Sequence, residues 1–384
     1  MKFPNTIHSK LPKAGISIFA KMSRLSDETG AINLSQGFPE FDAPDALKAL
    51  VTKHMKKGMN QYASMLGVLP LREAIAEEFK KNYNTVYDPE TEINITAGAT
   101  QAIFTALASV IQEGDEVIVL EPAYDSYVPA ITLNGGIPVY LELKAPDYSI
   151  DWDGMRKLIN PRTRMIMLNT PHNPTGSILS AEDIKKLEQI TKNTDIIILS
   201  DEVYERIIFD GSTHQSMARY PKLAERSFII GSLSKVFSAT GWKIGYCVAP
   251  ENLMSEFRKV HQFVVFCVNS AVQYAMAEYM QKPEALDGVA EMYQERRDKF
   301  LKLVKKTRFT CIPSSGSYFQ LLNYKNISDE AEVAFAERLT REHGVATIPI
   351  SVFYHKNVEN KVLRFCFAKS DETLEKAIER LCKI

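Results

Sequence analysis

The sequence predicts an α/β fold with a mostly parallel sheet, followed by a smaller α+β region. Between residues 92 and 251, short runs of apolar and β-branched residues alternate with segments of helical periodicity. Such alternation is typical of parallel strands that helices cover on both faces. After Glu251 long helical segments with a few short strands take over. The seven expected strands of the sheet are Ile93–Thr96, Glu116–Leu120, Ile137–Leu141, Met165–Asn169, Ile196–Ser200, Phe228–Gly231 and Ile244–Val248.

The helices between these strands are expected from apolar positions at helical spacing. Ser180 is followed three residues later by Asp183, a pattern that resembles a capping box and marks one helix start. The helices predicted within the sheet region are Ala99–Ile111, Tyr124–Leu133, Asp153–Ile159 and Ser180–Thr191.

The segments on either side of the sheet region complete the expected order. Residues 1–35 form an arm with one short helical stretch near Ile18–Leu25, and helices follow at Asp45–Lys57 and Pro70–Tyr83. We divide the chain into residues 1–45 (arm and part of the small domain), 46–280 (large domain) and 281–384 (C-terminal small domain). The C-terminal elements expected are helices Asn252–Met280 (broken near Asn269), Leu286–Lys306, Glu330–His343 and Glu372–Cys382, and strands near Thr310–Ile312, Tyr318–Leu322, Val345–Thr347 and Val362–Phe367.

The composition narrows the function before any motif is considered. The 384 residues are 45% hydrophobic and 24% charged, as in ordinary globular proteins, and the formal net charge is −1. No basic tract favours nucleic acid, no apolar run approaches the roughly 18 residues of a membrane span, and no apolar core of a signal peptide stands near the start. The five cysteines are widely spaced, which indicates reduced thiols in a cytoplasmic protein. Neither cysteines nor histidines form a metal motif.

Five strand ends carry side chains that suit a ligand site, because open α/β sheets bind ligands at the carboxyl ends of their strands. Small residues after the first strand open a helix whose N–H groups suit a phosphate. Each side chain also has an ordinary explanation, such as packing, a turn, a cap or a surface lysine, but their coincidence favours a site. The strand ends carry Gly98-Ala99-Thr100, Tyr124, Asn173, Asp201 with Tyr204, and Lys235.

This set of groups matches the needs of a pyridine aldehyde cofactor. Lys235 lies between a strand end and an apolar segment, where desolvation lowers the pKa of an amine and favours imine formation with the aldehyde. A buried carboxylate such as Asp201 keeps the ring nitrogen protonated. A phenol and an amide can hold the ring oxygen, and an aromatic face can hold the ring plane.

Three motifs follow these strand ends: Asn173-Pro174-Thr175-Gly176, Asp201-Glu202-Val203-Tyr204, and Ser232-Leu233-Ser234-Lys235 with Gly241-Trp242-Lys243-Ile244-Gly245. With them the chain resembles a class I pyridoxal-phosphate-dependent aminotransferase of fold type I over nearly its whole length. Four further stretches are similar to the branch that holds methionine aminotransferases, kynurenine aminotransferases and glutamine transaminase K. These stretches are Leu34–Pro39, Asn60–Tyr62, Thr170–Pro174 and Leu363–Phe367.

The resemblance implies a reaction and a set of roles. An L-amino acid, methionine before aromatic amino acids or glutamine, gives its amino group to a 2-oxo acid in a ping-pong reaction with pyridoxal 5'-phosphate. Lys235 forms the imine and shuttles the proton, and Asp201 pairs with the ring nitrogen. Tyr204 and Asn173 bind the ring oxygen, while Tyr124 stacks on the ring where many relatives have Phe.

The resemblance also assigns the groups that hold the phosphate and the substrate. Arg364 binds the substrate carboxylate with Asn173 and the backbone near Gly37, although alternation alone lets Arg364 point to solvent. A homodimer with shared active sites is implied, in which Tyr62 reaches the partner's phosphate. The phosphate is held by Gly98, Ala99, Thr100, Ser232 and Lys243, where many relatives carry Arg instead of Lys243.

The substrate and the reaction leave alternatives open. No second arginine can be assigned to a side-chain carboxylate, and the aromatic residues expected at the pocket favour an apolar or sulfur-bearing side chain. A carbon–sulfur β-lyase or a decarboxylase shares most of these motifs, and a non-enzymatic regulator is a remote alternative that the short N-terminal arm opposes. The expected aromatic residues are Phe19, Tyr62, Tyr124, Phe263 and Phe266, of which the last two equally fit the core of a long helix.

Overall fold

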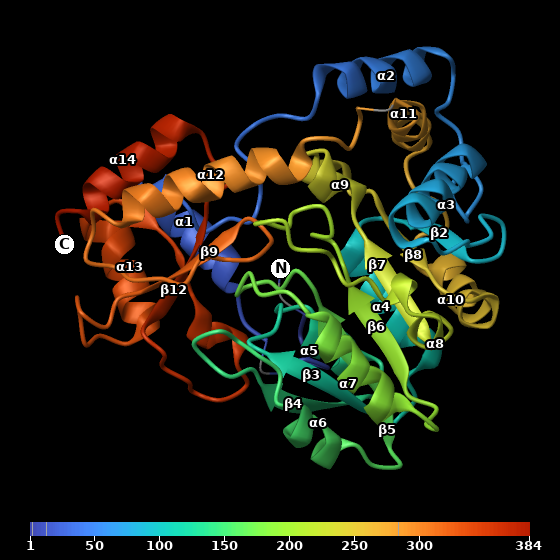
Figure 1. Ribbon diagram of the computed structural model, residues 1–384, viewed down its shortest axis with the longest axis horizontal. Helices are drawn as coiled ribbons and strands as arrows, with labels where there is room; N and C mark the ends of the chain where they lie inside the picture. The colour runs from blue at the N-terminus through green and yellow to red at the C-terminus, as the bar shows by residue number, and fades with distance from the viewer. Residues whose placement is uncertain (2, 13, 283) are drawn as a thin grey trace.

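A seven-stranded sheet forms the centre of the larger part of the molecule (Figure 1). The computed structural model describes residues 1, 3–12, 14–282 and 284–384. In this sheet β8 runs antiparallel to both of its neighbours and the other strands are mutually parallel, so the predicted fold class is confirmed. The strand order is β2 (Ile93–Thr96), β8 (Gly245–Val248), β7 (Ser227–Gly231), β6 (Ile197–Asp201), β5 (Thr163–Asn169), β3 (Glu116–Glu121) and β4 (Ile137–Glu142).

Helices cover both faces of this sheet, because alternate side chains of a strand enter different apolar clusters. In β3, Val117 and Val119 pack in one cluster with residues of α4 and α10, whereas Ile118 packs in the other. The helices of this part are α2 (Asp45–Lys56), α3 (Leu69–Tyr83), α4 (Ala99–Val110), α5 (Tyr127–Leu133), α6 (Trp152–Leu158), α7 (Ala181–Thr191), α8 (Pro221–Ala224), α9 (Leu233–Val236), α10 (Glu251–Val264) and α11 (Ser270–Met280), with 3-10 turns η1 (Met217–Arg219) and η2 (Thr240–Trp242).

A second, smaller body combines the two ends of the chain. Figure 1 shows α1 among the C-terminal helices, and β1 pairs in parallel with β10. A three-stranded antiparallel sheet has β12 at its centre, between β11 and β9. The elements are α1 (Ile18–Thr29), β1 (Ile32–Asn33), α12 (Val289–Val304), β9 (Phe319–Asn323), α13 (Glu332–Glu342), β10 (Val345–Ala346), β11 (Ile348–Pro349), η3 (Ile350–Phe353), β12 (Val362–Cys366) and α14 (Asp371–Leu381).

Most expected elements are present within a few residues, and the departures have local reasons. The capping box at Ser180 is confirmed, since its hydroxyl accepts the Asp183 N–H while the Asp183 carboxylate accepts the Ser180 N–H. The strand expected near Thr310–Ile312 is wrong, because only an isolated bridge joins Thr310 to Asn323. The helix expected from Leu286 begins at Val289, after Gly288 with φ of 73°. Among the described residues, no helix combines the length and apolar character that crossing a membrane requires.

Candidate active site

A cavity of about 350 Å³ lies at the carboxyl edge of the large sheet, facing β9 and β12 of the small body. Every predicted site residue except Tyr62 lines this cavity, so residues from eight separate segments of the chain meet there. The predicted residues in its wall are Gly37, Gly98, Ala99, Thr100, Tyr124, Asn173, Asp201, Tyr204, Ser232, Lys235, Lys243 and Arg364.

The N-terminus of α4 borders one part of the cavity. Gly98 precedes the helix with φ of 79°, a conformation that glycine adopts without strain. A Cβ on Gly98 would lie 3.2 Å from Nζ of Lys243, so the absence of a side chain keeps space beside this ammonium. Ser232 and Thr100 also line the cavity. Free N–H groups of a helix start, hydroxyls and an ammonium together suit a phosphate group.

Asp201 ends β6 and is almost completely buried. One of its carboxylate oxygens accepts a hydrogen bond from the Tyr127 hydroxyl at 2.6 Å, and the other accepts the Val203 N–H at 3.3 Å. Burial raises the pKa of Asp201 to about 6, an effect that the bond from Tyr127 opposes. A buried carboxylate of this kind gains from a cationic partner in the cavity, such as a protonated ring nitrogen.

Lys235 lies in the short helix α9, directly after β7, rather than in a loop. Its Nζ donates to the Tyr318 hydroxyl at 2.7 Å and to the Gly37 carbonyl at 3.1 Å. Burial lowers the pKa of Lys235 to about 8, and the charges of Lys243 and Arg364 act in the same direction. The lowered pKa raises the neutral fraction of the amine near neutral pH, and the neutral form is the nucleophile and the base.

Arg364 lies on the central strand of the small sheet and its side chain is buried. One Nη donates to Asn173 Oδ1 at 2.7 Å, and the other donates to the Ser35 carbonyl at 2.9 Å. The guanidinium lies 3.9 Å from the centre of the Phe319 ring, and burial lowers the pKa of Arg364 to about 10. Its Nε has no hydrogen-bond partner among the described residues. A guanidinium fork that these bonds fix at the wall of the cavity suits a carboxylate.

A chain of amides connects Arg364 to the strand that carries Asp201. Asn169, the last residue of β5, accepts the Asn173 N–H at 2.8 Å through its side-chain oxygen. The same side chain donates to the Asp201 carbonyl at 2.9 Å. Asn169 therefore fixes both predicted motifs relative to each other.

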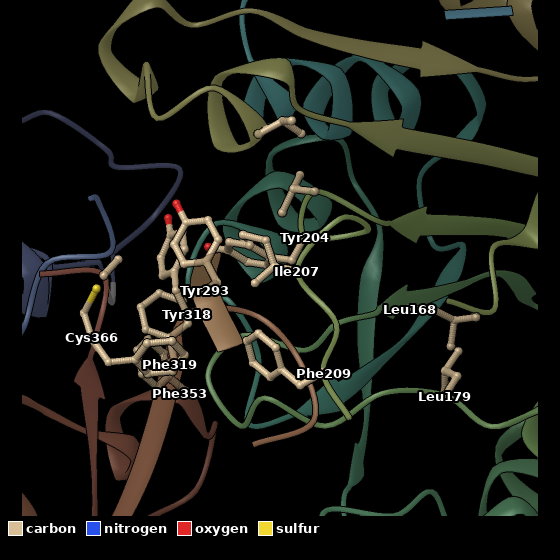
Figure 2. Close-up of a cluster of buried hydrophobic side chains, with 14 of the residues drawn as sticks. Leu168, Leu179, Tyr204, Ile207, Phe209, Tyr293, Tyr318, Phe319, Phe353 and Cys366 are labelled. Carbon is tan, nitrogen blue, oxygen red and sulfur yellow. The ribbon is translucent and has the colours of Figure 1, made fainter. Parts of the chain in front are cut away.

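Buried aromatic rings, among them Tyr204, Tyr318 and Phe319, gather in one cluster (Figure 2). The Tyr204 ring meets the Tyr318 ring edge to face, with centroids 5.0 Å apart. Burial raises the pKa of the Tyr204 hydroxyl, so that it remains a protonated donor at physiological pH. Tyr124 lines the cavity as a flat face, and Phe19 lies there as predicted.

Three predicted aromatic residues lie outside the cavity. Tyr62 is 84% exposed and its ring meets that of Phe266 edge to face. Phe263 is 86% exposed and Phe266 47%, so the expectation that they line this chain's pocket is wrong, and so is the alternative of a helix core. Phe263 falls near the end of α10 on its solvent side, and Phe266 follows that helix with φ of 68°.

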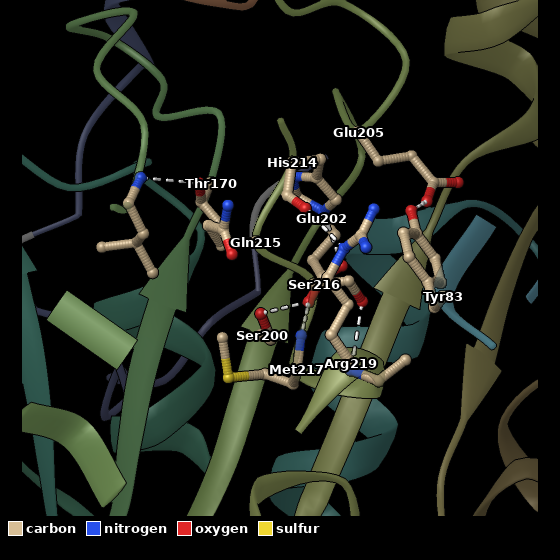
Figure 3. Close-up of polar contacts among 12 residues, drawn as sticks. Tyr83, Thr170, Ser200, Glu202, Glu205, His214, Gln215, Ser216, Met217 and Arg219 are labelled. Atoms are coloured by element: carbon tan, nitrogen blue, oxygen red, sulfur yellow. Dashed lines mark hydrogen bonds and ion pairs between the residues drawn. The ribbon is translucent and has the colours of Figure 1, made fainter. Parts of the chain in front are cut away.

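A buried polar cluster anchors the segment that follows Asp201 (Figure 3). The Glu202 carboxylate accepts from the Ser200 hydroxyl at 2.8 Å and from the Met217 N–H at 3.1 Å, and it pairs with His214 Nε2 at 2.8 Å. Glu202, His214 and Glu205 lie close enough to share a metal ion. However, protein donors already bind the Glu202 and Glu205 carboxylates, and the absence of a metal requirement stays a prediction.

Sequence reasoning missed several functional contacts. Tyr127 follows the predicted Tyr124 by three residues, which would place both on one side of the helix expected over Tyr124–Leu133, and this signal was available although α5 itself begins only at Tyr127. Asn169 ends a predicted strand, so its place at the edge of the sheet could also have been predicted. Tyr318 and Gln36 carry no local signal, because their neighbours in space are distant in sequence.

The assembled groups fit pyridoxal phosphate: an anion site at α4, a carboxylate for a ring cation, an amine with lowered pKa and an aromatic face. A family model, aminotransferase class I and II, matches residues 29–381. The chain belongs to this family and is a pyridoxal-phosphate-dependent aminotransferase of fold type I.

Individual relatives agree with this assignment. The chain is 43% identical over 374 residues to the methionine aminotransferase of Escherichia coli strain K12, covering 97% of each chain. It is 32% identical to the kynurenine–oxoglutarate transaminase of Dictyostelium discoideum, covering 96% of this chain and 94% of the relative. The solved structure of Escherichia coli YbdL, described as having a methionine aminotransferase function, superposes with a TM-score of 0.97 at 42% identity, covering 99% of this chain and all of the other.

Proposed function

We propose that this aminotransferase takes methionine as its preferred amino donor and passes the amino group to a 2-oxo acid. One observation carries the proposal. The basic residues that line the described cavity are Lys235, Lys243 and Arg364. Each already has a proposed role: Lys235 is the reacting amine, Lys243 binds the phosphate and Arg364 binds the α-carboxylate. Among the described lining residues, no further cation is left to pair with an acidic side chain of a substrate. Phe19 and Phe319 offer apolar surface instead. An unbranched thioether suits such a surface. The similarity to the Escherichia coli methionine aminotransferase supports the same choice.

The geometry supports a role for each of the chain's own site residues. Pyridoxal phosphate supplies an electron sink when it is bound. Arg364, which lines the cavity, holds the α-carboxylate with its guanidinium, and the bond to Asn173 fixes the guanidinium plane. The amine of Lys235 removes the α-proton and later returns it, and Asp201 keeps a negative charge for the ring nitrogen. The Tyr204 hydroxyl donates a hydrogen bond to the ring oxygen. Lys243, Ser232 and the N-terminus of α4 hold the phosphate.

We also propose that the active protein is a homodimer. An exposed apolar surface surrounds Tyr62, Phe263 and Phe266, which suits a second copy of this chain and a shared site with Tyr62 at the partner's phosphate. Domain boundaries at residues 45 and 280 and a cytoplasmic location remain proposals as well. Sedimentation velocity of the holoenzyme tests the dimer, and Phe263→Ser with Phe266→Ser should favour monomers. A wild-type monomer at micromolar concentration contradicts it.

The substrate proposal is tested by competition among amino donors. Purified holoenzyme receives one 2-oxo acid acceptor with methionine, phenylalanine, glutamine or aspartate, and kcat/KM is measured for each. Methionine should give the highest value and aspartate the lowest, because a second carboxylate would enter the apolar part of the cavity unpaired. A preference for aspartate contradicts the proposal. Pyruvate and ammonia released from a cysteine conjugate faster than methionine is transaminated would identify a β-lyase instead.

A further inference from the structure

Two oxygen atoms from the small body hold the amine of the catalytic lysine. Lys235 Nζ donates to the Tyr318 hydroxyl at 2.7 Å and to the Gly37 carbonyl at 3.1 Å. The Tyr318 hydroxyl donates its own proton to the Gly37 carbonyl at 2.5 Å. We propose that Tyr318, with the Gly37 carbonyl, is a positioning residue that orients the free amine of Lys235 so that its lone pair faces the cavity.

The protons and lone pairs of the amine fix which bonds it can make. An ammonium carries three N–H groups, whereas a neutral amine carries two and a lone pair. Tyr318 commits its single proton to Gly37, and its oxygen therefore accepts from Lys235. Both N–H groups of the neutral amine then point at Tyr318 and Gly37. Because Lys235 also lines the cavity, the lone pair is left for that side.

Both acceptors are held rigidly. Tyr318 is fully buried, and its ring contacts those of Tyr204 and Phe319 at centroid distances of 5.0 and 4.9 Å (Figure 2). A Cβ on Gly37 would lie 2.8 Å from Phe319, so this loop packs tightly against the same ring. The lysine side chain has four rotatable bonds, and fixed acceptors reduce the number of positions that its amine takes.

The positioning matters at the step in which the amine acts as a base. The α C–H bond of the substrate breaks, an N–H bond forms on Lys235, and the electron pair passes to the sink that the cofactor supplies. The amine gains its third N–H on the side where the lone pair stood, while its two bonds to Tyr318 and Gly37 persist. This inference rests on the aminotransferase reaction, not on methionine as the donor.

The first test uses the apoenzyme and no amino acid. Pyridoxal phosphate is added over a range of pH, and the rate at which the lysine-bound absorbance band forms reports the neutral fraction of the amine. Tyr318→Phe removes an acceptor that stabilises the ammonium, so the profile should move about one unit to lower pH. The other charged or titratable groups that face the amine stay in place: Cys366, Lys243, Arg364, Asp201 and Tyr204.

Tyr293 provides a matched control. Its ring is buried, and the centroids of the Tyr293 and Tyr318 rings lie 5.8 Å apart. Its hydroxyl takes no part in the described bonds among Lys235, Gly37 and Tyr318. Tyr293→Phe should leave the pH profile unchanged. A Tyr318→Phe profile that overlays that of the wild type overturns the inference, whatever the enzyme's amino donor proves to be.

The second test separates positioning from simple packing. The half-reaction with methionine and with α-deuterated methionine is followed in single turnover. Tyr318→Phe should slow it about 10–100-fold with a larger isotope effect, because proton transfer becomes more rate-limiting, while KM changes little. A rise in KM with an unchanged rate and isotope effect would assign Tyr318 to packing and overturn the inference.

Discussion

The two walls of the cavity are built differently. The sheet wall consists of Gly98–Thr100, Asn173, Asp201 and Lys235, each placed at the end of a strand of the large sheet or within a few residues after it. The small-body wall consists of Gly37, Phe319 and Arg364, which lie far apart in the sequence, and Tyr318, the residue before Phe319, contacts Gly37. In the proposed reaction, the sheet wall carries the groups that face the cofactor, whereas the small-body wall orients the substrate and the amine. Two contacts join the walls, at Lys235 and at Arg364, and we propose that the reaction depends on both.

The most damaging change removes the amine that both walls share. Lys235→Ala should lower kcat by about 10⁴-fold or more, because no other group takes the proton. The assay is steady-state transamination, with total pyridoxal phosphate measured to confirm that the protein still folds. Lys222→Ala, at an exposed position of α8, is the control and should leave kcat unchanged. More than a tenth of wild-type activity in Lys235→Ala contradicts the shared role.

The second change weakens the substrate contact of the small-body wall. Arg364→Lys keeps a positive charge but loses the fork that Asn173 fixes. Loss of charged hydrogen bonds of about 1.5–3 kcal/mol should raise KM for the amino acid about 10–100-fold. Pyridoxal phosphate affinity should change little, since the sheet wall is intact. Arg341→Lys on α13 is an exposed control. An unchanged KM would remove Arg364 from carboxylate binding.

The third change exposes a conflict between stability and function in the sheet wall. The pKa of Asp201 is raised from 3.8 to about 6 by burial, so between these values the folded apoenzyme binds more protons than the unfolded chain. Its stability therefore falls as pH rises through that window, and the full loss persists above pH 6. Asp201→Asn should make the apoenzyme about 1–3 kcal/mol more stable at pH 8 and no different below pH 4.

Urea unfolding of the apoenzyme at several pH values measures this difference. Asp195→Asn, at an exposed position just before β6, should show none. With cofactor bound, the gain should disappear and turnover should fall, because the carboxylate then pairs with the ring nitrogen. A variant apoenzyme that is less stable than the wild type at pH 8 contradicts this account.

The smallest change lies outside both walls. Ser180→Ala removes the N-cap of α7 and should lower the free energy of unfolding by about 1 kcal/mol without changing kcat or KM. Ser255→Ala, inside α10 and exposed, serves as the control without a capping role. Thermal unfolding of the holoenzyme measures both. A loss of activity in Ser180→Ala at full cofactor occupancy would show that the walls are coupled to remote helices.

Sequence reasoning predicted the sheet wall well because each of its groups follows a recognisable strand. It predicted the small-body wall only in part. Alternation left Arg364 free to face solvent, and what decides its burial is the central place of β12 between β9 and β11, a long-range pairing. Tyr318 contacts Lys235 although 83 residues separate them in the sequence, so no local pattern predicts this contact. The exposure of Phe263 and Phe266 was missed because an apolar helix position resembles a core position whether another copy or this chain covers it.

The most direct measurement is the absorbance spectrum of the purified holoenzyme from about 300 to 500 nm, before and after methionine is added without an acceptor. The account predicts a band of lysine-bound cofactor that fades while the pyridoxamine form grows, with one amino group transferred per site. A bound cofactor that does not respond to methionine, but responds to aspartate, would contradict the proposed substrate. Absence of a cofactor band after pyridoxal phosphate is added would contradict the site itself.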